Sequence, residues 1–390
     1  MNIHFNVIMK KCFSFGIVLI MLGLNSCITE ITDFEQVESN SFLVVEATLS
    51  NQKGPHKVLV SFSSPSIDIN VENKPVKDAQ VYITDDKNVR EDLKEKEDGE
   101  YLTTSNFRGI VGNTYVLNII LPNGRKYQST PEKLNAAPLI DNVKSEFVVK
   151  TNYPLTDGRS VGFDVTVDFT DSPTPNQYYQ WKWTHYERTV YCATCSLGYD
   201  YVLKKCSLVP NYEADQEAPE TINFKCNATC FDISFSPTYI ILSDNLVNGQ
   251  KVTDFLVARV PYDKRGIYFM KLEQRVISKK MYEYYRSIKQ VTQNSGTLFD
   301  TPAETQLSPN IFSLDDTNER ILGVFEVFGS NEKFVYVDRL VGTDGYLPVL
   351  KQIFGRQLPN QSEPTDPPRP RAACIEGKYR TRTQPEGYRD

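Results

Sequence analysis

The chain has few of the residues and motifs on which most enzyme chemistry depends. Of its 390 residues three are histidine, and only His56 and His185 lie beyond the amino-terminal region. No G-x-S-x-G, H-E-x-x-H, P-loop or G-x-G-x-x-G motif occurs. Ser50 and Lys53 match S-x-x-K, but they fall in a predicted hairpin turn, so we attribute the match to chance. We therefore predict a protein that is not an enzyme and has no cofactor.

A surplus of positive charge is also absent. Lys and Arg total 43 against 49 Asp and Glu, and residues 1–26 hold two of the lysines and none of the acids. Without those residues the net charge is about −8. An acidic chain without a basic stripe does not suit nucleic-acid binding, so we expect no nucleic acid among its partners.

No apolar run reaches the about 20 residues that a membrane-spanning helix needs, and the stretch from Phe13 to Leu24 falls short. Lys10 and Lys11 precede this stretch, and the small residues of "NS" close it. A short apolar run after positive charge and before small residues is typical of a secretory signal. We predict that residues 1–26 are a signal peptide that is removed.

The four residues Leu24-Asn25-Ser26-Cys27 resemble a bacterial lipobox, in which the cysteine becomes the first residue of the mature chain and carries acyl chains. The alternative is an ordinary signal peptide with an incidental cysteine. We predict that Cys27 is a lipid anchor and that residues 27–40, which are acidic and lack hydrophobic periodicity, form a tether. Ile28 rather than Asp follows the cysteine, so we expect the outer membrane as the destination.

Of eight cysteines, Cys12 leaves with the signal and Cys27 is assigned to lipid. Six remain: Cys192, Cys195, Cys206, Cys226, Cys230 and Cys374. An even number in an exported chain predicts three disulfides, for which about fifteen pairings are possible. Five of the six lie within residues 191–230, so at least one of them must pair with Cys374.

Zinc binding is the alternative interpretation of these cysteines. Cys192-x-x-Cys195 and Cys226-x-x-x-Cys230 have the spacing of zinc ligands, and four thiolates could complete a tetrahedral site. The oxidising compartment, the two extra cysteines and the scarcity of histidine favour disulfides.

The fold is predicted to be mainly β. Short β-rich runs separated by turn signals fill residues 41–135, which we predict to form one β-sandwich domain. Their order resembles transthyretin-like and immunoglobulin-like sandwiches. The charged run from Asp85 to Glu100 lacks the D-x-D-x-D-G spacing of a calcium loop, so we interpret it as a solvated loop.

A second β-rich, sandwich-like domain is predicted over residues 136–358, with a cysteine-rich insertion over 191–230. The strand "YYQWKWTHYE" places Trp181, Trp183 and Tyr186 at spacings that suit either packing or a carbohydrate platform, and packing is the commoner use.

One amphipathic helix is predicted over residues 279–293, with Ser278 as its N-cap. Its apolar face consists of Met281, Tyr284, Tyr285, Ile288 and Val291. Beyond it, "RILGVFEVFGSNEKFVYVDR" predicts a hairpin, and residues 359–390 form a Pro-rich tail that cannot pack a core of its own.

Three stretches together resemble the DUF4249 family of Bacteroidota outer-membrane lipoproteins. They are "SFLVVEATLSNQKGPHKVLVS", "LEQRVISKKMYEYYRSIKQVTQNSGTLFDTPAETQLSPNIF" and "ERILGVFEVF". Family tails often carry paired cysteines, whereas only Cys374 matches here. The resemblance implies a non-catalytic binding or accessory subunit that works with a TonB-dependent (SusC-like) transporter in nutrient capture or outer-membrane assembly. The alternative is a surface-anchored hydrolase whose catalytic carboxylate pair has no recognisable motif.

Overall fold

The computed structural model describes a chain that is mainly β. The described residues are 41–64, 73–149, 161–191, 194–195, 199–200, 205–206, 222–224, 228–293, 310–343 and 372–389. The predicted signal peptide, the anchor Cys27 and the tether lie outside them, as does most of the cysteine-rich insertion. Within these ranges no helix has the length and apolar character needed to cross a membrane.

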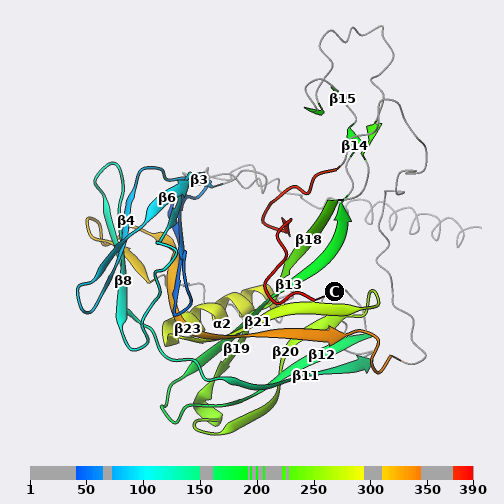
Figure 1. The fold of residues 1–390 in the computed structure, drawn as a ribbon. Helices are drawn as coiled ribbons and strands as arrows, with labels where there is room; N and C mark the ends of the chain where they lie inside the picture. The colour runs from blue at the N-terminus through cyan, green and yellow to red at the C-terminus, as the bar shows by residue number, and fades with distance from the viewer. Residues whose placement is uncertain are drawn as a thin grey trace, which may run out of the picture. The chain divides into compact units, whose positions relative to one another are not determined.

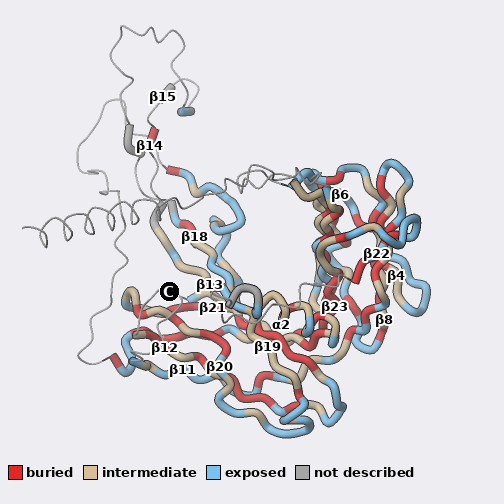
Figure 2. The backbone as a smooth tube through the Cα atoms, turned by 180° about the vertical axis from the view of Figure 1, so that it is seen from behind, coloured by how far each residue is buried: buried red, intermediate tan, exposed pale blue. Residues whose placement is uncertain are grey.

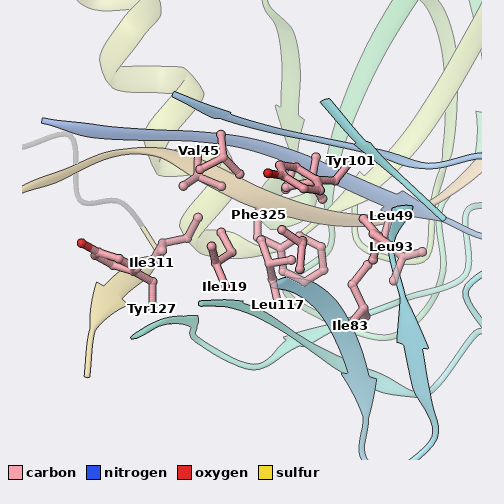
Figure 3. Packing of buried hydrophobic residues seen from close by; sticks show 14 of the residues in the cluster. Val45, Leu49, Ile83, Leu93, Tyr101, Leu117, Ile119, Tyr127, Ile311 and Phe325 are labelled. Carbon is pink, nitrogen blue, oxygen red and sulfur yellow. The ribbon is translucent and has the colours of Figure 1, made fainter. Parts of the chain in front are cut away.

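Two sheets pack face to face in the first half of the chain (Figures 1 and 3). One contains β1 (Leu43–Ser50), β2 (Lys57–Phe62), β3 (Lys74–Pro75), β6 (Lys94–Glu97) and β7 (Glu100–Leu102). The other contains β4 (Gln80–Asp85), β5 (Arg90–Asp92), β8 (Thr114–Ile120), β9 (Lys126–Ser129) and β10 (Glu132–Lys133). Every second residue of β1 is buried, because successive side chains of a strand point to opposite faces.

The core between these sheets is apolar and closed. Figure 3 shows Val45, Leu49, Ile83, Leu117, Ile119 and Phe325 converging between the two layers. The charged run 85–100, interpreted above as a loop, in fact contributes the short strands β5 and β6, while most of its side chains are exposed as expected.

This first sandwich is not continuous in sequence. β22 (Ile311–Ser313) pairs with β9, and β23 (Ile321–Asp338) runs parallel to β1 from Leu43↔Ile321 to Ser50↔Phe328. The range 41–135 predicted for this domain therefore lacks two of its strands.

The hairpin predicted over 320–339 is wrong, because β23 is a single long strand. Gly329 and Ser330, which suggested a turn, instead lie close to other segments of the chain. A Cβ at Gly329 would collide with the backbone carbonyl of Asn135, and the side chain of Asn51 accepts a hydrogen bond from the Ser330 backbone nitrogen (2.7 Å). Glycine is required there by close backbone approach.

Beyond Gly329, β23 pairs with β21 (Ile267–Ile277) and so enters the second half of the molecule. The strand order is β24-β18-β13-β21-β23-β1-β2-β7-β6, where the further members are β13 (Tyr178–Tyr191), β18 (Ala228–Phe235) and β24 (Arg380–Thr381). β19 (Ile240–Ser243) pairs with β13, and the 3-10 helix η1 (Asp244–Leu246) follows it.

A separate sheet of β11 (Ile140–Val149), β12 (Val161–Thr170) and β20 (Lys251–Pro261) packs on one face of the long sheet. The second core lies between them and includes Phe169, Tyr179, Trp181, Met270 and Leu272, all fully buried. Buried residues are frequent on β12 and β21, where several are consecutive, whereas β11 is mostly half-buried or exposed (Figure 2).

The predicted helix is confirmed as α2 (Lys279–Gln293). Ser278 caps it, since its hydroxyl oxygen accepts a hydrogen bond from the Met281 backbone nitrogen (3.3 Å). Met281 and Tyr285 are buried in a third apolar cluster with Phe328 of β23. The helix lies against β13 and β19 (Figure 1).

The described cysteines form disulfides, Cys195 with Cys206 and Cys230 with Cys374. Cys192 and Cys226 lie outside the described residues. Because Cys195 and Cys230 are bonded to other cysteines, the tetrahedral zinc site considered above is not formed. The insertion also contributes four short strands: β14 (Thr194–Cys195), β15 (Tyr199–Asp200), β16 (Lys205–Cys206) and β17 (Ile222–Asn223).

A candidate ligand-binding trough

The aromatic residues of β13 do not form a joint platform. Trp181 is fully buried in the second core, where its Nε1 donates to Oε1 of Gln274 (3.0 Å). Trp183 packs partly buried against the same core, whereas Tyr186 lies on the opposite face of the strand. The structure thus shows the packing role for the tryptophans and excludes the platform.

The other face of β13 is polar. Gln180, Lys182 and Thr184 alternate with the tryptophans, and in register Gln180 lies opposite Arg275 of β21 while Lys182 lies opposite Glu273. Residues directly opposite each other in neighbouring strands share a face, so these side chains form one polar surface.

This polar surface borders two cavities. The first, of about 560 Å³, is the polar trough, with a floor of Gln180, Lys182, Thr184, Lys271, Glu273, Arg275 and Glu332. The second, of about 580 Å³, is the helix-side cavity, and it lies between α2 and the strands β1, β2 and β23. Lys182 and Tyr239 line both cavities.

The sequence of β21 explains how the trough is bounded. On the face of β21 that bears the trough, Phe269 comes first and Ile277 comes last. Between them lie the trough residues Lys271, Glu273 and Arg275. Phe269 packs against Tyr388 of the carboxyl-terminal segment, and Ile277 belongs to the cluster under α2. The helix therefore covers one end of this sheet face and the carboxyl-terminal segment covers the other, while the trough lies between them.

The carboxyl-terminal segment is fixed by several contacts. Cys374 is bonded to Cys230 of β18, β24 pairs with β18, and the Tyr336 hydroxyl donates to the Gly387 carbonyl. These contacts hold Tyr388 against the ring of Phe231 (4.9 Å between centroids). Residues 372–389 of the Pro-rich tail are thus held on the outer face of the sheet.

A buried ionic network crosses the floor of the trough. Nη2 of Arg275 lies 2.5 Å from Oε2 of Glu273, and Nη1 lies 3.5 Å from Oε2 of Glu326. The guanidinium also lies over the Phe328 ring, 4.0 Å from its centroid. Burial opposes the charge of Arg275, but the two carboxylates outweigh it and raise the pKa of the guanidinium.

Lys182 has a weaker partner. Its ammonium nitrogen lies 3.8 Å from Oε2 of Glu326, beyond hydrogen-bond distance, and 5.5 Å from the centre of the Tyr285 ring. Burial lowers the pKa of Lys182, and the charge of Glu326 opposes that shift only in part. The amine is therefore positioned to donate hydrogen bonds into both cavities.

Two polar groups of this surface have no hydrogen-bond partner among the described residues. Gln180 is fully buried, and neither Oε1 nor Nε2 of its amide is bonded. Oε1 of Glu326, a side chain that is 3% exposed, is also without a partner. Burial and the charge of Glu326 raise the pKa of the Tyr285 phenol, whose hydroxyl faces the side chains of both Glu326 and Gln180, and the interaction with Gln180 lowers that pKa in part. Buried polar groups are nearly always bonded. Of these exceptions Gln180 lines the trough and Glu326 lines the helix-side cavity, so the unpaired amide of Gln180 marks the trough as the candidate site.

The residues that the sequence analysis considered for enzyme chemistry, and did not assign to it, do not line the trough. The Ser50 hydroxyl accepts a hydrogen bond from the Gln52 backbone nitrogen (3.2 Å), and Lys53 is exposed. His56 is buried, and burial lowers its pKa. His185 stacks on Tyr268 in the second core. The structure brings none of them together, and the described ranges hold no group of three or more possible metal ligands.

A family model described as "Domain of unknown function (DUF4249)" matches residues 29–333. The chain belongs to this DUF4249 family. The match includes β1, β13, β21, α2 and most of β23, and so the elements that form the trough. No curated protein and no solved structure shows a significant match.

Sequence reasoning did not identify the polar trough residues. One local signal was available, because Gln180 and Lys182 alternate with aromatic residues along a strand. Their relation to Arg275 and Glu326 depends on the pairing of β13, β21 and β23, which no local pattern indicates.

Proposed function

We propose that this protein is a lipid-anchored, non-catalytic binding subunit of the outer membrane that works with a TonB-dependent transporter in nutrient capture. The resemblance of residues 24–27 to a lipobox supports the anchor, and what the resemblance of the three quoted stretches to DUF4249 lipoproteins implies supports the partner. The observation that carries the binding role is the fully buried, unpaired amide of Gln180 at the floor of the trough.

Binding without catalysis is favoured by the ion pairs of the carboxylates that line the trough and the helix-side cavity. Glu273 is engaged by Arg275, Glu326 by Arg275 and Lys182, and Glu332 by Lys271 at 2.7 Å. With each carboxylate held by a cation, we assign none of them as an acid or a nucleophile, and the hydrolase alternative gains no support.

Replacing the anchor tests the membrane attachment. Cys27→Ser should release a folded protein into the periplasm or the medium, because no other attachment is proposed. Cys12→Ser, within the predicted signal, is the matched control and should leave the protein in the membrane. Recovery of Cys27→Ser in the membrane fraction would contradict the proposal.

Purification from detergent-solubilised outer membranes tests the partnership. The intact lipidated chain should co-purify with a TonB-dependent transporter in a fixed ratio. Its isolation without any such transporter would refute this part of the proposal.

A further inference from the structure

The trough lies on the face of a sheet and not at an edge. β13 pairs with β18 and β21, β21 pairs with β13 and β23, and β23 pairs with β1 and β21. The backbone groups of these strands are therefore used within the sheet, and a ligand must be recognised by side chains. This arrangement disfavours an extended peptide, which binds by adding a strand to a free edge.

The charges around the trough balance. The cations are Lys182, Lys271 and Arg275, and the carboxylates that engage them are Glu273, Glu326 and Glu332. A balanced set of ion pairs gives no field that would concentrate a strongly charged ligand, so the geometry favours a neutral one.

The unpaired groups specify what that neutral ligand must offer. The amide of Gln180 needs one donor and one acceptor, and the ammonium of Lys182 can still donate. A hydroxyl group is both a donor and an acceptor. Neighbouring hydroxyl groups on a ring can therefore satisfy the two ends of one planar amide.

Apolar surface borders the same groups. Tyr186, Phe235, Pro237 and Tyr239 line the trough, and Phe235 is 46% exposed. Tyr239 is held in place by stacking on Tyr285, with 5.0 Å between the ring centroids. Fixed aromatic faces beside polar side chains suit a ligand with an apolar face and a hydroxylated rim.

We infer that the polar trough binds a neutral oligosaccharide, with Gln180 and Lys182 bonding its hydroxyl groups and Tyr239 packing against a ring face. The volume of about 560 Å³ lies within the range of about 300–1,000 Å³ for small-ligand sites. The inference rests on the proposed binding function and gives it a ligand class.

Calorimetry on the full-length Cys27→Ser protein tests this inference. The probes are neutral gluco-, manno-, xylo- and galacto-oligosaccharides, with a sulfated oligosaccharide and a pool of neutral tetrapeptides as comparisons. At least one neutral oligosaccharide should bind, and Gln180→Leu and Lys182→Ala should each weaken that binding at least about tenfold, since each removes hydrogen bonds that water does not replace.

The matched control is Lys251→Ala, an exposed lysine at the start of β20 on the three-stranded sheet, which should leave affinity unchanged. Circular dichroism and thermal melting show whether each variant is folded. No binding of any neutral oligosaccharide, equal binding by Gln180→Leu, or binding only of the sulfated or peptide probes would overturn the inference. If the transporter still co-purifies in that case, the accessory function stands without this ligand class.

Discussion

Gln180 and Gln274 are both fully buried and lie on neighbouring strands of one sheet, but their side chains have opposite surroundings. On the inner face, Oε1 of Gln274 accepts from Trp181 and its Nε2 donates to the Pro138 carbonyl (3.0 Å). On the outer face, the amide of Gln180 has no partner among the described residues. The hydrogen bonds of Gln274 stabilise the fold, whereas the unpaired amide of Gln180 can bind a ligand.

Two buried arginines show the same contrast. Arg339, 1% exposed, bonds the Gly266 carbonyl (3.1 Å), Asp263 (3.2 Å) and Glu187 (3.5 Å) at the end of β23. Arg275 is equally well bonded, yet the Glu326 that it engages keeps one oxygen unpaired. Buried atoms without a partner among the described residues also occur elsewhere, at Nε2 of His56 and Oγ of Ser243, so the outer face is distinguished by unpaired groups that border a cavity.

The largest expected effect lies on the inner face. Gln274→Leu removes the partner of the buried Trp181 indole nitrogen and one of two donors to the half-buried Pro138 carbonyl, which keeps the hydrogen bond from Asn331. Because an unsatisfied buried group costs about 1–3 kcal/mol, the free energy of unfolding should fall by about 1–3 kcal/mol. Urea denaturation measures this, and a loss below about 1 kcal/mol would remove the distinction between the two glutamines.

A smaller and pH-dependent effect is expected at Glu187. Burial opposes its ionisation, but hydrogen bonds from His185 and Lys264 and the charge of Arg339 outweigh burial and hold the pKa below its ordinary value of 4.5. The carboxylate therefore stabilises the fold fully above pH 4.5, and that contribution is lost as pH falls through the lowered pKa.

Glu187→Gln should accordingly be less stable than the wild-type protein at neutral pH and should lose less of its stability on acidification. Denaturation at a series of pH values down to about pH 3 measures how the free energy of unfolding of each protein changes with pH. An equal change of the free energy of unfolding with pH in the two proteins would show that Glu187 does not lose a stabilising contribution on acidification.

The smallest effect on stability is expected at Gln180. Gln180→Leu removes a buried amide that has no partner, so the free energy of unfolding should stay unchanged or rise by up to about 1 kcal/mol. Loss of stability comparable to that of Gln274→Leu would mean that Gln180 serves the fold.

Local sequence patterns predicted the features that local physics determines. The helix over 279–293 is indicated by its apolar periodicity and by the capping Ser278, and its observed bounds agree. The alternation of β1 and β8 likewise indicated half-buried strands. These signals need no knowledge of a distant partner.

Local sequence patterns could not predict which strands pair when the strands are distant in the sequence. The parallel pair of β1 and β23 joins Leu43 to Ile321, and the glycine that suggested a turn in β23 is there because Asn135 comes close. The trough has the same origin, because Gln180, Arg275 and Glu326 meet only through the register of three strands. Residues that look like ordinary surface polar groups in the sequence become buried once that register is formed.

The central claim is that Gln180 binds a ligand whereas Gln274 stabilises the fold. It is tested most directly by NMR of both side-chain amides in one sample. In the Cys27→Ser protein labelled with ¹⁵N-glutamine, the side-chain amide signals of Gln180 and Gln274 are assigned by their loss in Gln180→Leu and Gln274→Leu. On addition of the neutral oligosaccharide that binds in calorimetry, we predict that the Gln180 signals shift while those of Gln274 stay in place. Unchanged Gln180 signals at saturation would contradict the claim that this buried amide is a ligand-binding group.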